Sequence, residues 1–586
     1  MNAELRTRPV DKAVMYTALQ QGYTPLQARV IAGRVAGVQD VAGLINPAVK
    51  SLDPPDLLPD IDIAAKVLAD AVMCPDTTIV GLTDHDCDGS TSGSVFRLAM
   101  IDYFGVPAHR VVNMQSHRMR EGYGVSESVV ERLLERVKLP CVVCTGDQGS
   151  GDEPRIAQLK AAGIPVVVTD HHGVEGKGPP SAAACVNPAR EDSIFQDKLI
   201  AGVHVMFLVM CAVRRELIAR GALPQSAPSL APLLAWSCIG TTADAVSLGK
   251  SRNNRAIIRH GLHLMNSSAR APWIAAKRVQ GNDGPFKTKD LSHFLCAMVN
   301  ARGRMGDAIA SIDFLVSNDQ AQADYLAELL KAENESRKLV EREMTKVARE
   351  IAEVQAEAGV PAIVVHLADG HSGVHGITAS RLVEAFGRPV CCLSPKQGHP
   401  GLVTGSLRTI EGVHVRSALA EVDRAEPGCL LGWGGHAGAG GLQMQEANIE
   451  RFHEAFCRAV LKQRDTTNAQ PVVWSDGSLG RPPTLDVIAE LDALEPYGRE
   501  FESPSFTDAF RVLSVKPVGD GSHLKLELVD QDGVAQRGIW FRAMEPGHEA
   551  PVAVGQHIEA TYQVAANTFR GRTYVDLQVA HARVIA

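Results

Sequence analysis

Five short apolar runs alternate with helix-like stretches between residues 79 and 186, and this alternation constrains the fold more than any other feature. The runs cover residues 79–82, 110–114, 141–145, 166–169 and 183–186, and the stretch 126–137 is one of the helix-like segments between them. Short apolar runs rich in β-branched residues are typical of buried strands. Strands that alternate with helices predict an α/β domain with a doubly wound parallel sheet.

The first apolar run ends in three closely spaced carboxylates, Asp84, Asp86 and Asp88, before Gly89 opens a helix-like stretch. In a parallel α/β sheet, ligands bind beyond the carboxyl ends of the strands. Carboxylates packed this closely raise one another's pKa unless a cation lies among them. The motif therefore favours a divalent metal, although a solvated acidic turn or a Ca²⁺ loop of the D-x-D-x-D-G type gives the same pattern.

Carboxylates and imidazoles also stand just past the later apolar runs or between small residues further along the chain, namely Asp147, Asp170, His171, His172 and Asp244. Each of these alone is explained by a helix cap or a surface turn. Together they predict a cluster of two metal ions bridged by Asp147, with the ligands Asp86, Asp88, Asp147, His171 and Asp244. Oxygen ligands suit Mg²⁺ or Mn²⁺, and the added imidazole favours Mn²⁺.

Length and composition predict a multidomain globular protein. The 586 residues are 45% apolar, enough for several cores, and a prior of about one domain per 150 residues suggests three or four domains. Twelve cysteines without dense spacing fit a reducing cytoplasm. We expect no membrane segment, because no run reaches the roughly 18 apolar residues of a span. The net charge of -8 gives no global sign of nucleic acid, so such a partner needs local basic patches.

The rest of the chain divides by pattern. The predicted parts are an N-terminal helical lead-in (1–75), the α/β domain (76–320), a long linking helix (321–358), a smaller α/β domain (359–465), a linker (466–505) and a β domain (506–586). The linking helix is predicted from a stretch without Gly or Pro whose apolar stripe comprises Val340, Met344, Val347, Ile351 and Val354. A coiled coil used for dimerisation is the alternative interpretation of this stretch.

Two later regions predict contacts with a nucleic acid. Ser406 and Arg408 stand near a Gly-rich loop around His436, where backbone N–H groups and a guanidinium fork suit a phosphate. A flexible linker is the alternative for that loop. The tail alternates polar and apolar residues, as the short strands of an OB-fold do, and interleaves aromatic residues with arginines. Within it Trp540, Phe569 and Arg570 are predicted to contact a strand.

The motifs DHDCDG (84–89), GDQG (146–149), TDHHG (169–173) and TADAVSL (242–248) resemble the four motifs of the DHH phosphoesterase superfamily. The segments REGYGVS (120–126), NARGRMGDA (300–308) and LEPYGREFESP (494–504) are more narrowly similar to its single-stranded-DNA-specific exonucleases. The resemblance covers nearly the whole chain. It implies a DHH domain, a linking helix, a DHH-associated domain and an OB-fold, with 5′ to 3′ release of 5′-mononucleotides in DNA repair and recombination.

The resemblance also implies roles for individual residues. The metal ligands would be Asp84, Asp86, Asp88, Asp147, His171 and Asp244, holding two Mn²⁺ or Mg²⁺ ions. His172 would contact the phosphate, and Asp170 would orient His171 through its other ring nitrogen. Arg118, Tyr123 and Arg304 would contact the substrate together with Ser406, Arg408 and His436.

The first motif departs from the family's pattern. His85 and Cys87 stand where the family usually has Tyr and Ala, and Leu82 stands where it often has a His. The loss of that imidazole leaves one ion with fewer ligands, and Asp84, His85 or water are the candidates to complete it. Gln148 replaces the usual Cys or Asn, which is a milder change.

The resemblance implies single-stranded DNA as the partner, a single-stranded-DNA-binding protein or a helicase as candidate protein partners, a monomer and a cytoplasmic location. Two other functions remain open from the sequence. One is a DHH phosphodiesterase of short oligonucleotides or cyclic dinucleotides, which has no need of the OB-like tail. The other is a catalytically impaired scaffold that binds DNA, which the altered first motif permits.

Overall fold

The computed structural model describes residues 4–306, 308–464, 471–544, 547–569 and 571–585. The chain divides into two compact units. The barrel unit comprises Met1–Ala48, Ser247–Arg255 and Pro471–Ala586, and the two-sheet unit comprises Val49–Val246 and Ala256–Gln470. Each unit is described by itself.

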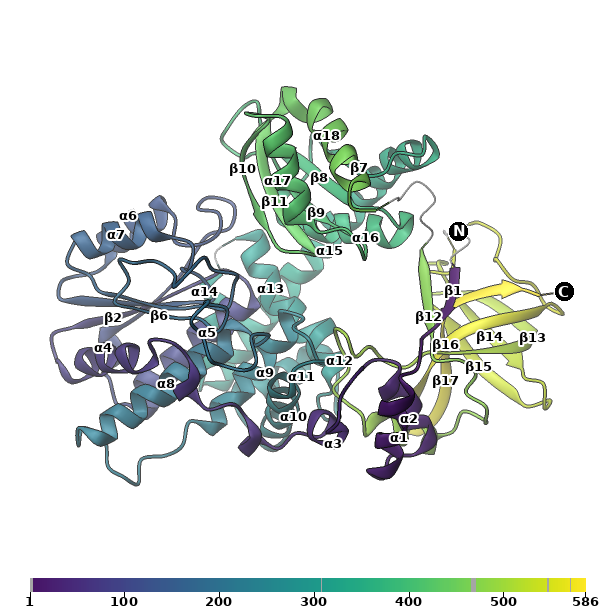
Figure 1. The fold of residues 1–586 in the computed structure, drawn as a ribbon. Coiled ribbons are helices and arrows are strands. Elements are labelled where there is room, and N and C mark those ends of the chain that lie inside the picture. The colour runs from purple at the N-terminus through teal and green to yellow at the C-terminus, as the bar shows by residue number, and fades with distance from the viewer. Residues whose placement is uncertain (1–3, 307, 465–470, 545–546, 570, 586) are drawn as a thin grey trace. The chain divides into compact units, whose positions relative to one another are not determined.

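The first sheet of the two-sheet unit confirms the predicted doubly wound fold. Its five strands are parallel in the order β3-β2-β4-β5-β6. Two of them, β2 and β6, are labelled in Figure 1. They are β2 (Thr78–Thr83), β3 (Val111–Gln115), β4 (Cys141–Gly146), β5 (Val166–Thr169) and β6 (Ala184–Val186). The order reverses at β2, so that β3 and β4 lie on its two sides, and ligands bind at such a point in open α/β sheets.

Helices cover both faces of this sheet, because each strand is apolar on both sides. Val80 and Leu82 pack with α6 (Glu127–Arg136) and α7 (Glu153–Ala161) in one apolar cluster. Gly81 points to the opposite face, where its missing Cβ leaves room for Phe96 of α5. Helices α4 (Ile61–Met73), α5 (Cys87–Leu98) and α8 (Gly202–Ala219) also contact the sheet.

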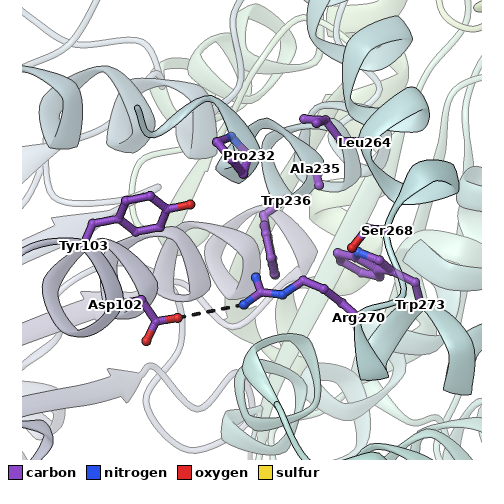
Figure 2. A pocket seen from close by; sticks show the side chains of 9 residues that line it. All are labelled: Asp102, Tyr103, Pro232, Ala235, Trp236, Leu264, Ser268, Arg270 and Trp273. Carbon is purple, nitrogen blue, oxygen red and sulfur yellow. Dashed lines mark ion pairs between the residues drawn. The ribbon is translucent and has the colours of Figure 1, made fainter. Parts of the chain in front are cut away.

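A group of helices follows the first sheet: α9 (Leu234–Ala243), α10 (Arg252–Ser267), α11 (Ala271–Gln280), α12 (Thr288–Asp290), α13 (Cys296–Met305) and α14 (Ile309–Val316). A pocket of about 420 Å³ opens between α9, α11 and the end of the π-helical segment Ala99–Tyr103 (Figure 2). Arg270 lies over the Trp236 ring at 4.9 Å, and its Nη2 is 3.9 Å from Asp102 Oδ2. The opposite charges of Asp102 and Arg270 therefore lie together in the pocket, which the rings of Trp236 and Trp273 also line.

The long helix α15 (Gln320–Glu357) confirms the predicted linking helix, but part of its predicted stripe faces solvent. Met344 packs against the second sheet, whereas Val347 and Val354 are 49% and 69% exposed. The side facing the sheet is completed by Ala348 and Ala352 instead. Small residues allow the helix to approach the strands closely, so the contact face is shifted from the line of larger side chains.

The second sheet is mixed, in the order β10-β11-β9-β8-β7. Its strands are β7 (Ile363–His366), β8 (Val390–Pro395), β9 (Leu402–Arg408), β10 (Leu430–Gly435) and β11 (Ala439–Gln445). Helices α15 and α16 (His375–Phe386) pack on one face, and α17 (Val415–Ala425) and α18 (Ile449–Leu461) pack on the other.

The barrel unit contains the predicted OB-fold, a closed barrel in the order β13-β14-β15-β17-β16. Its strands are β13 (Phe506–Val518), β14 (His523–Val529), β15 (Ala535–Trp540), β16 (His557–Phe569) and β17 (Arg572–Val584). Other elements of the unit are α1 (Lys12–Gln20), α2 (Pro25–Ala32), α3 (Val41–Ile45), α19 (Leu485–Asp492) and the parallel pair β1 (Glu4–Thr7) and β12 (Val472–Ser475).

The N-terminal helices pack with the tail rather than forming a separate lead-in. The buried Arg255 donates to the carbonyls of Ile45, Leu494 and Pro496, and Arg34 makes a buried ion pair with Asp476. These contacts join three distant stretches of the chain, which periodicity does not reveal. In the described part of the chain, no helix combines the length and apolarity needed to cross a membrane.

Candidate metal centre

The first motif is a tight turn between β2 and α5. Asp86 caps α5, because its Oδ1 accepts a hydrogen bond from Gly89 N at 3.0 Å. A Cβ on Gly89 would stand 2.2 Å from the carbonyl oxygen of Asp84, so this position requires glycine. Gln115, at the end of β3, donates to the same carbonyl at 2.9 Å. The three carboxylates of the motif are therefore held at the carboxyl end of the sheet, as predicted from the sequence.

Asp88 is held by the N-terminus of α8. Its Oδ2 accepts from Gly202 N at 2.7 Å and its Oδ1 from Val203 N at 3.0 Å. Burial, followed by the charges of Asp244 and Asp86, nevertheless raises the pKa of Asp88 well above its ordinary value. The sequence reasoning missed the two α8 amides, since no side-chain motif marks them.

Asp147 lies at the centre of the acidic residues in a strained backbone conformation. Its φ of 61° is left-handed, which is uncommon for a residue other than glycine and is found at functional sites. Burial, then the charges of Asp88 and Asp86, raises the pKa of Asp147 well above its ordinary value. A Cβ on Gly202 would stand 2.8 Å from Asp147 Oδ1, so only glycine lets α8 approach so closely.

His171 points a ring nitrogen into the carboxylates. Its Nε2 lies 3.1 Å from Asp147 Oδ1, 3.7 Å from Asp244 Oδ2 and 3.8 Å from Asp88 Oδ2. Burial is the largest cause that lowers the pKa of His171, so the ring is neutral at neutral pH. Although His171 Nε2 and Asp147 Oδ1 lie close together, they do not form a hydrogen bond with each other. Neither atom has another hydrogen-bond partner among the described residues. An imidazole nitrogen surrounded by carboxylate oxygens fits a bound cation.

Three sets of side chains have ligand atoms within 4.8 Å of one another. We call them the carboxylate group (Asp84, Asp86, Asp147), the mixed group (Asp88, His171, Asp244) and the histidine group (Asp147, His171, His172). Asp147 belongs to two of them, as does His171. The predicted ligands are thus brought together, and their oxygen and imidazole donors match those that Mg²⁺ and Mn²⁺ take.

One predicted contact is wrong. Asp170 does not reach the ring of His171; its Oδ1 contacts His172 Nδ1 at 2.8 Å and accepts from the backbone N of His171 at 2.8 Å. Burial opposes a charge on His172, but the contact with Asp170 outweighs it and raises the pKa of His172 to about 10. The ring of His172 also stacks on His436 at 5.5 Å, so the second sheet contributes to this side of the site. Two consecutive histidines point in different directions from a turn, which spacing alone does not assign.

A basic group of residues lies beside the carboxylates. Burial and the charge of Arg118 lower the pKa of Arg304 to about 10, and its Nη1 donates to Gly373 O at 3.1 Å. Arg118 lies over the Tyr123 ring at 5.2 Å, and Tyr123 is 66% exposed. These three predicted substrate contacts therefore lie together.

The predicted phosphate contacts of the second sheet share one strand. Ser406 and Arg408 are two residues apart on β9, so they point to the same face. Arg408 Nη2 would stand 2.5 Å from a Cβ on Gly376, so this glycine makes room for the guanidinium. Burial lowers the pKa of Arg408 first, and the charge of Arg118 acts in the same direction. A buried guanidinium that also feels the charge of a second arginine is stabilised by an anionic ligand.

The strand contacts predicted in the barrel are Trp540, Phe569 and Arg570. Trp540 is only 8% exposed, so its ring belongs to the barrel interior. Arg570 and the side chain of Phe569 lie outside the described part of the chain. Phe541, the next residue after Trp540, is 52% exposed and contacts the ring of His523 at 5.5 Å. The prediction that Trp540 contacts a strand is therefore wrong, and the exposed ring belongs to Phe541, in the turn that follows β15.

The comparisons with known proteins agree with this arrangement. Residues 76–236 match the DHH family, N-terminal domain, residues 359–462 match the DHHA1 domain, and residues 482–581 match the RecJ OB domain. The chain is 34% identical to the single-stranded-DNA-specific exonuclease RecJ of Dickeya dadantii, over 99% of this chain and 98% of that protein. The chain belongs to the RecJ family.

Other members of the RecJ family are similar over their length. The chain is 32% identical to the single-stranded-DNA-specific exonuclease RecJ of Escherichia coli, covering 97% of each chain. The crystal structure of RecJ in complex with Mn²⁺ from Thermus thermophilus superposes with a TM-score of 0.76 at 25% identity, covering 99% of this chain and 79% of that one. The family's three named domains thus correspond to the first sheet, the second sheet and the barrel.

Proposed function

We propose that this protein is a metal-dependent exonuclease that degrades single-stranded DNA from its 5′ end and releases 5′-mononucleotides. The observation that carries the proposal is the shared position of Asp147, which belongs both to the carboxylate group and to the histidine group. Relatives named as single-stranded-DNA-specific exonucleases, and a RecJ structure solved with Mn²⁺, support the substrate and the ion.

Different side chains of such a site would bind the ions and contact the phosphate. The carboxylate group would hold one ion, and the mixed group, which shares His171 with the histidine group, would hold the other. Asp147 belongs to the carboxylate group and lies 3.1 Å from His171 Nε2, so its carboxylate is near both sets of ligands. When bound, the two ions activate a water and neutralise the charge that develops on the phosphate. His172, kept protonated by Asp170, is placed to donate a charged hydrogen bond to a phosphate oxygen.

The basic residues are proposed to bind the 5′ end of the DNA strand. Arg118 and Arg408 act on each other electrostatically, and Tyr123 exposes a ring beside Arg118. A guanidinium binds a terminal phosphate through two N–H groups, and an exposed ring stacks on a base. We therefore propose that Arg408 and Arg118 bind the 5′-phosphate and that Tyr123 supports the adjoining nucleotide.

We propose that the barrel also binds the single strand. OB-folds bind nucleic acid on the face of their second and third strands, which here are β14 and β15. Phe541 follows β15 and His523 begins β14, so the exposed ring belongs to that face. The barrel favours long strands over short oligonucleotides or cyclic dinucleotides as substrates. The three groups of converging ligand atoms favour catalysis over a scaffold role.

The test is a time course on 5′-labelled DNA, single-stranded and duplex, with Mn²⁺, with Mg²⁺ and with a chelator. We expect metal-dependent release of labelled mononucleotide at the earliest times, and only from the single strand. Equal cleavage of the duplex, or release that begins at the 3′ end, would contradict the proposal. The protein partners predicted above, a single-stranded-DNA-binding protein or a helicase, stay predictions.

A further inference from the structure

The carboxylate group differs from the other two sets of ligands because it contains no imidazole. Three negative side chains within 4.8 Å of one another repel, so each needs a donor that fixes its orientation before an ion arrives. Asp86 has such a donor in Gly89 N. The donors of Asp84 lie elsewhere, on β3 and in the motif itself.

Two side chains converge on a single oxygen of Asp84. Ser116 Oγ donates to Asp84 Oδ1 at 3.0 Å, and His85 Nδ1 lies 3.0 Å from the same oxygen. His85 Nδ1 is also 3.0 Å from Ser116 Oγ, so the three groups form a closed triangle. Both partners therefore engage Oδ1 and leave the other oxygen of Asp84 to face a ligand.

The triangle is rigid because its members are tied to different elements. Ser116 follows β3, and its backbone N donates to Thr83 O of β2 at 3.1 Å. The carbonyl of His85 lies against Gly303 of α13, where a Cβ would come within 2.0 Å of the oxygen. His85 and Ser116 are both buried. Among the described residues, His85 Nε2 has no hydrogen-bond partner, so Nδ1 is the atom through which the ring acts.

We propose that His85 and Ser116 are positioning residues that hold the Asp84 carboxylate for the ion of the carboxylate group. His85 itself belongs to none of the three sets of ligand atoms. Its imidazole thus contributes to ion binding through Asp84 and not by direct ligation. The inference rests on the two-ion site proposed above and identifies how this chain completes it.

The experiment measures how many Mn²⁺ ions the full chain binds and the affinity of each, by calorimetry and by the EPR signal of free Mn²⁺. The parent is expected to bind two ions. His85→Phe and Ser116→Ala should each weaken one of them by about 10- to 100-fold and leave the other unchanged, as loss of a partner that orients a ligand does. His85→Asn, whose side-chain N–H can occupy the place of Nδ1, should restore most of the affinity.

A matched control and a mutant cycle separate positioning from a general structural effect. His375 is another buried histidine that contacts a serine, with Nε2 2.7 Å from Ser394 Oγ, and His375→Phe should leave both Mn²⁺ affinities unchanged. In an Asp84→Asn background, His85→Phe should have no further effect on Mn²⁺ binding, because its route to the ion is already lost. Ser116→Ala removes a single atom and keeps the test informative should the His85 variants fail to fold.

The outcomes distinguish the inference from the proposed function. Two ions in the parent with affinities unchanged in Ser116→Ala and His85→Phe would overturn the positioning role alone. An equal loss on adding His85→Phe to the Asp84→Asn protein would also overturn it, since the ring would then act by another route. A parent that binds fewer than two ions would overturn the two-ion site and this inference together.

Discussion

The two sheets of the two-sheet unit place different polar side chains at the ends of their strands. After β2, β4 and β5 of the first sheet come Asp86, Asp147 and His171. In the second sheet Arg408 ends β9, and His436 follows β10 directly. The same architectural position thus holds ion ligands in one sheet and predicted phosphate contacts in the other.

The difference lies in how each charge is stabilised. Backbone N–H groups of other elements hold the carboxylates, as Gly202 and Val203 hold Asp88. Backbone carbonyls hold the guanidiniums, as Gly373 O holds Arg304. A metal cation and a phosphate anion therefore meet complementary surfaces, and the first two of the following predictions each remove one side of that complementarity.

The largest effect is expected at the shared carboxylate. Asp147→Asn keeps a residue that tolerates the left-handed backbone but removes the charge that two ligand groups share. We expect the rate of nucleotide release at saturating Mn²⁺ to fall by about a thousandfold or more, because both ions lose a ligand. The matched control is Asp152→Asn, a partly buried carboxyl whose pKa is also raised by burial but which belongs to none of the ligand groups. Activity of Asp147→Asn within about tenfold of the parent would contradict the assignment.

The next effect tests the basic side. Arg408→Ala should lower the preference for a 5′-phosphorylated strand by about tenfold or more, since a charged hydrogen bond is worth about 1.5–3 kcal/mol. The measurement compares kcat/KM on strands with and without the 5′-phosphate. Arg381→Ala is the control. Arg381 lies on α16, which packs on the second sheet, but it pairs with Glu341 and Glu384. An unchanged ratio in the Arg408 variant would remove the phosphate role.

A smaller effect is expected in the barrel. Phe541→Ala should weaken binding of long single strands by about 5- to 100-fold, the value of one stacked base, and leave very short strands unaffected. Val534→Ala, another exposed apolar residue of the barrel, is the control without an aromatic ring. Filter binding with strands of increasing length makes the comparison. A point variant is preferable to removal of the tail, because the tail supplies carbonyl acceptors to the buried Arg255.

The smallest effect is expected in the pH dependence of stability and concerns two buried histidines, His204 on α8 and His375 on α16. Burial lowers the pKa of His204 and of His375 to about 3, so both rings stay neutral in the fold. Below about pH 6.5 the unfolded chain binds the proton and the folded chain does not, so stability falls as the pH drops, by up to about 1.4 kcal/mol per pH unit for each ring. Urea unfolding between pH 4 and 7 should show a shallower loss for His204→Phe and for His375→Phe. An unchanged slope in both variants would mean that neither ring titrates on unfolding.

Much of the site could be predicted because its chemistry is local. One short motif contains Asp86 and Asp88. Asp147 and His171 follow predicted strands directly, and this position predicts that they lie at the same edge of the sheet. The partner of Asp170 could not be predicted, since neighbouring histidines at a turn diverge by their backbone angles. The exposed ring of Phe541 was missed because only the folded barrel shows that β15 ends at Trp540, with the Trp540 ring inside the barrel and Phe541 in the exposed turn.

The sequence by itself determined the order of the domains, the parallel sheet and the residues that can ligate a metal, because periodicity and short motifs are properties of adjacent residues. Only the tertiary structure decided which atoms meet. The α8 amides reach Asp88 from 114 and 115 residues away, and Ser116 reaches Asp84 from 32 residues away. Such contacts depend on close approaches that a single glycine permits, as at Gly202 and Gly303, and no pattern of neighbouring residues encodes the partner that fills the space.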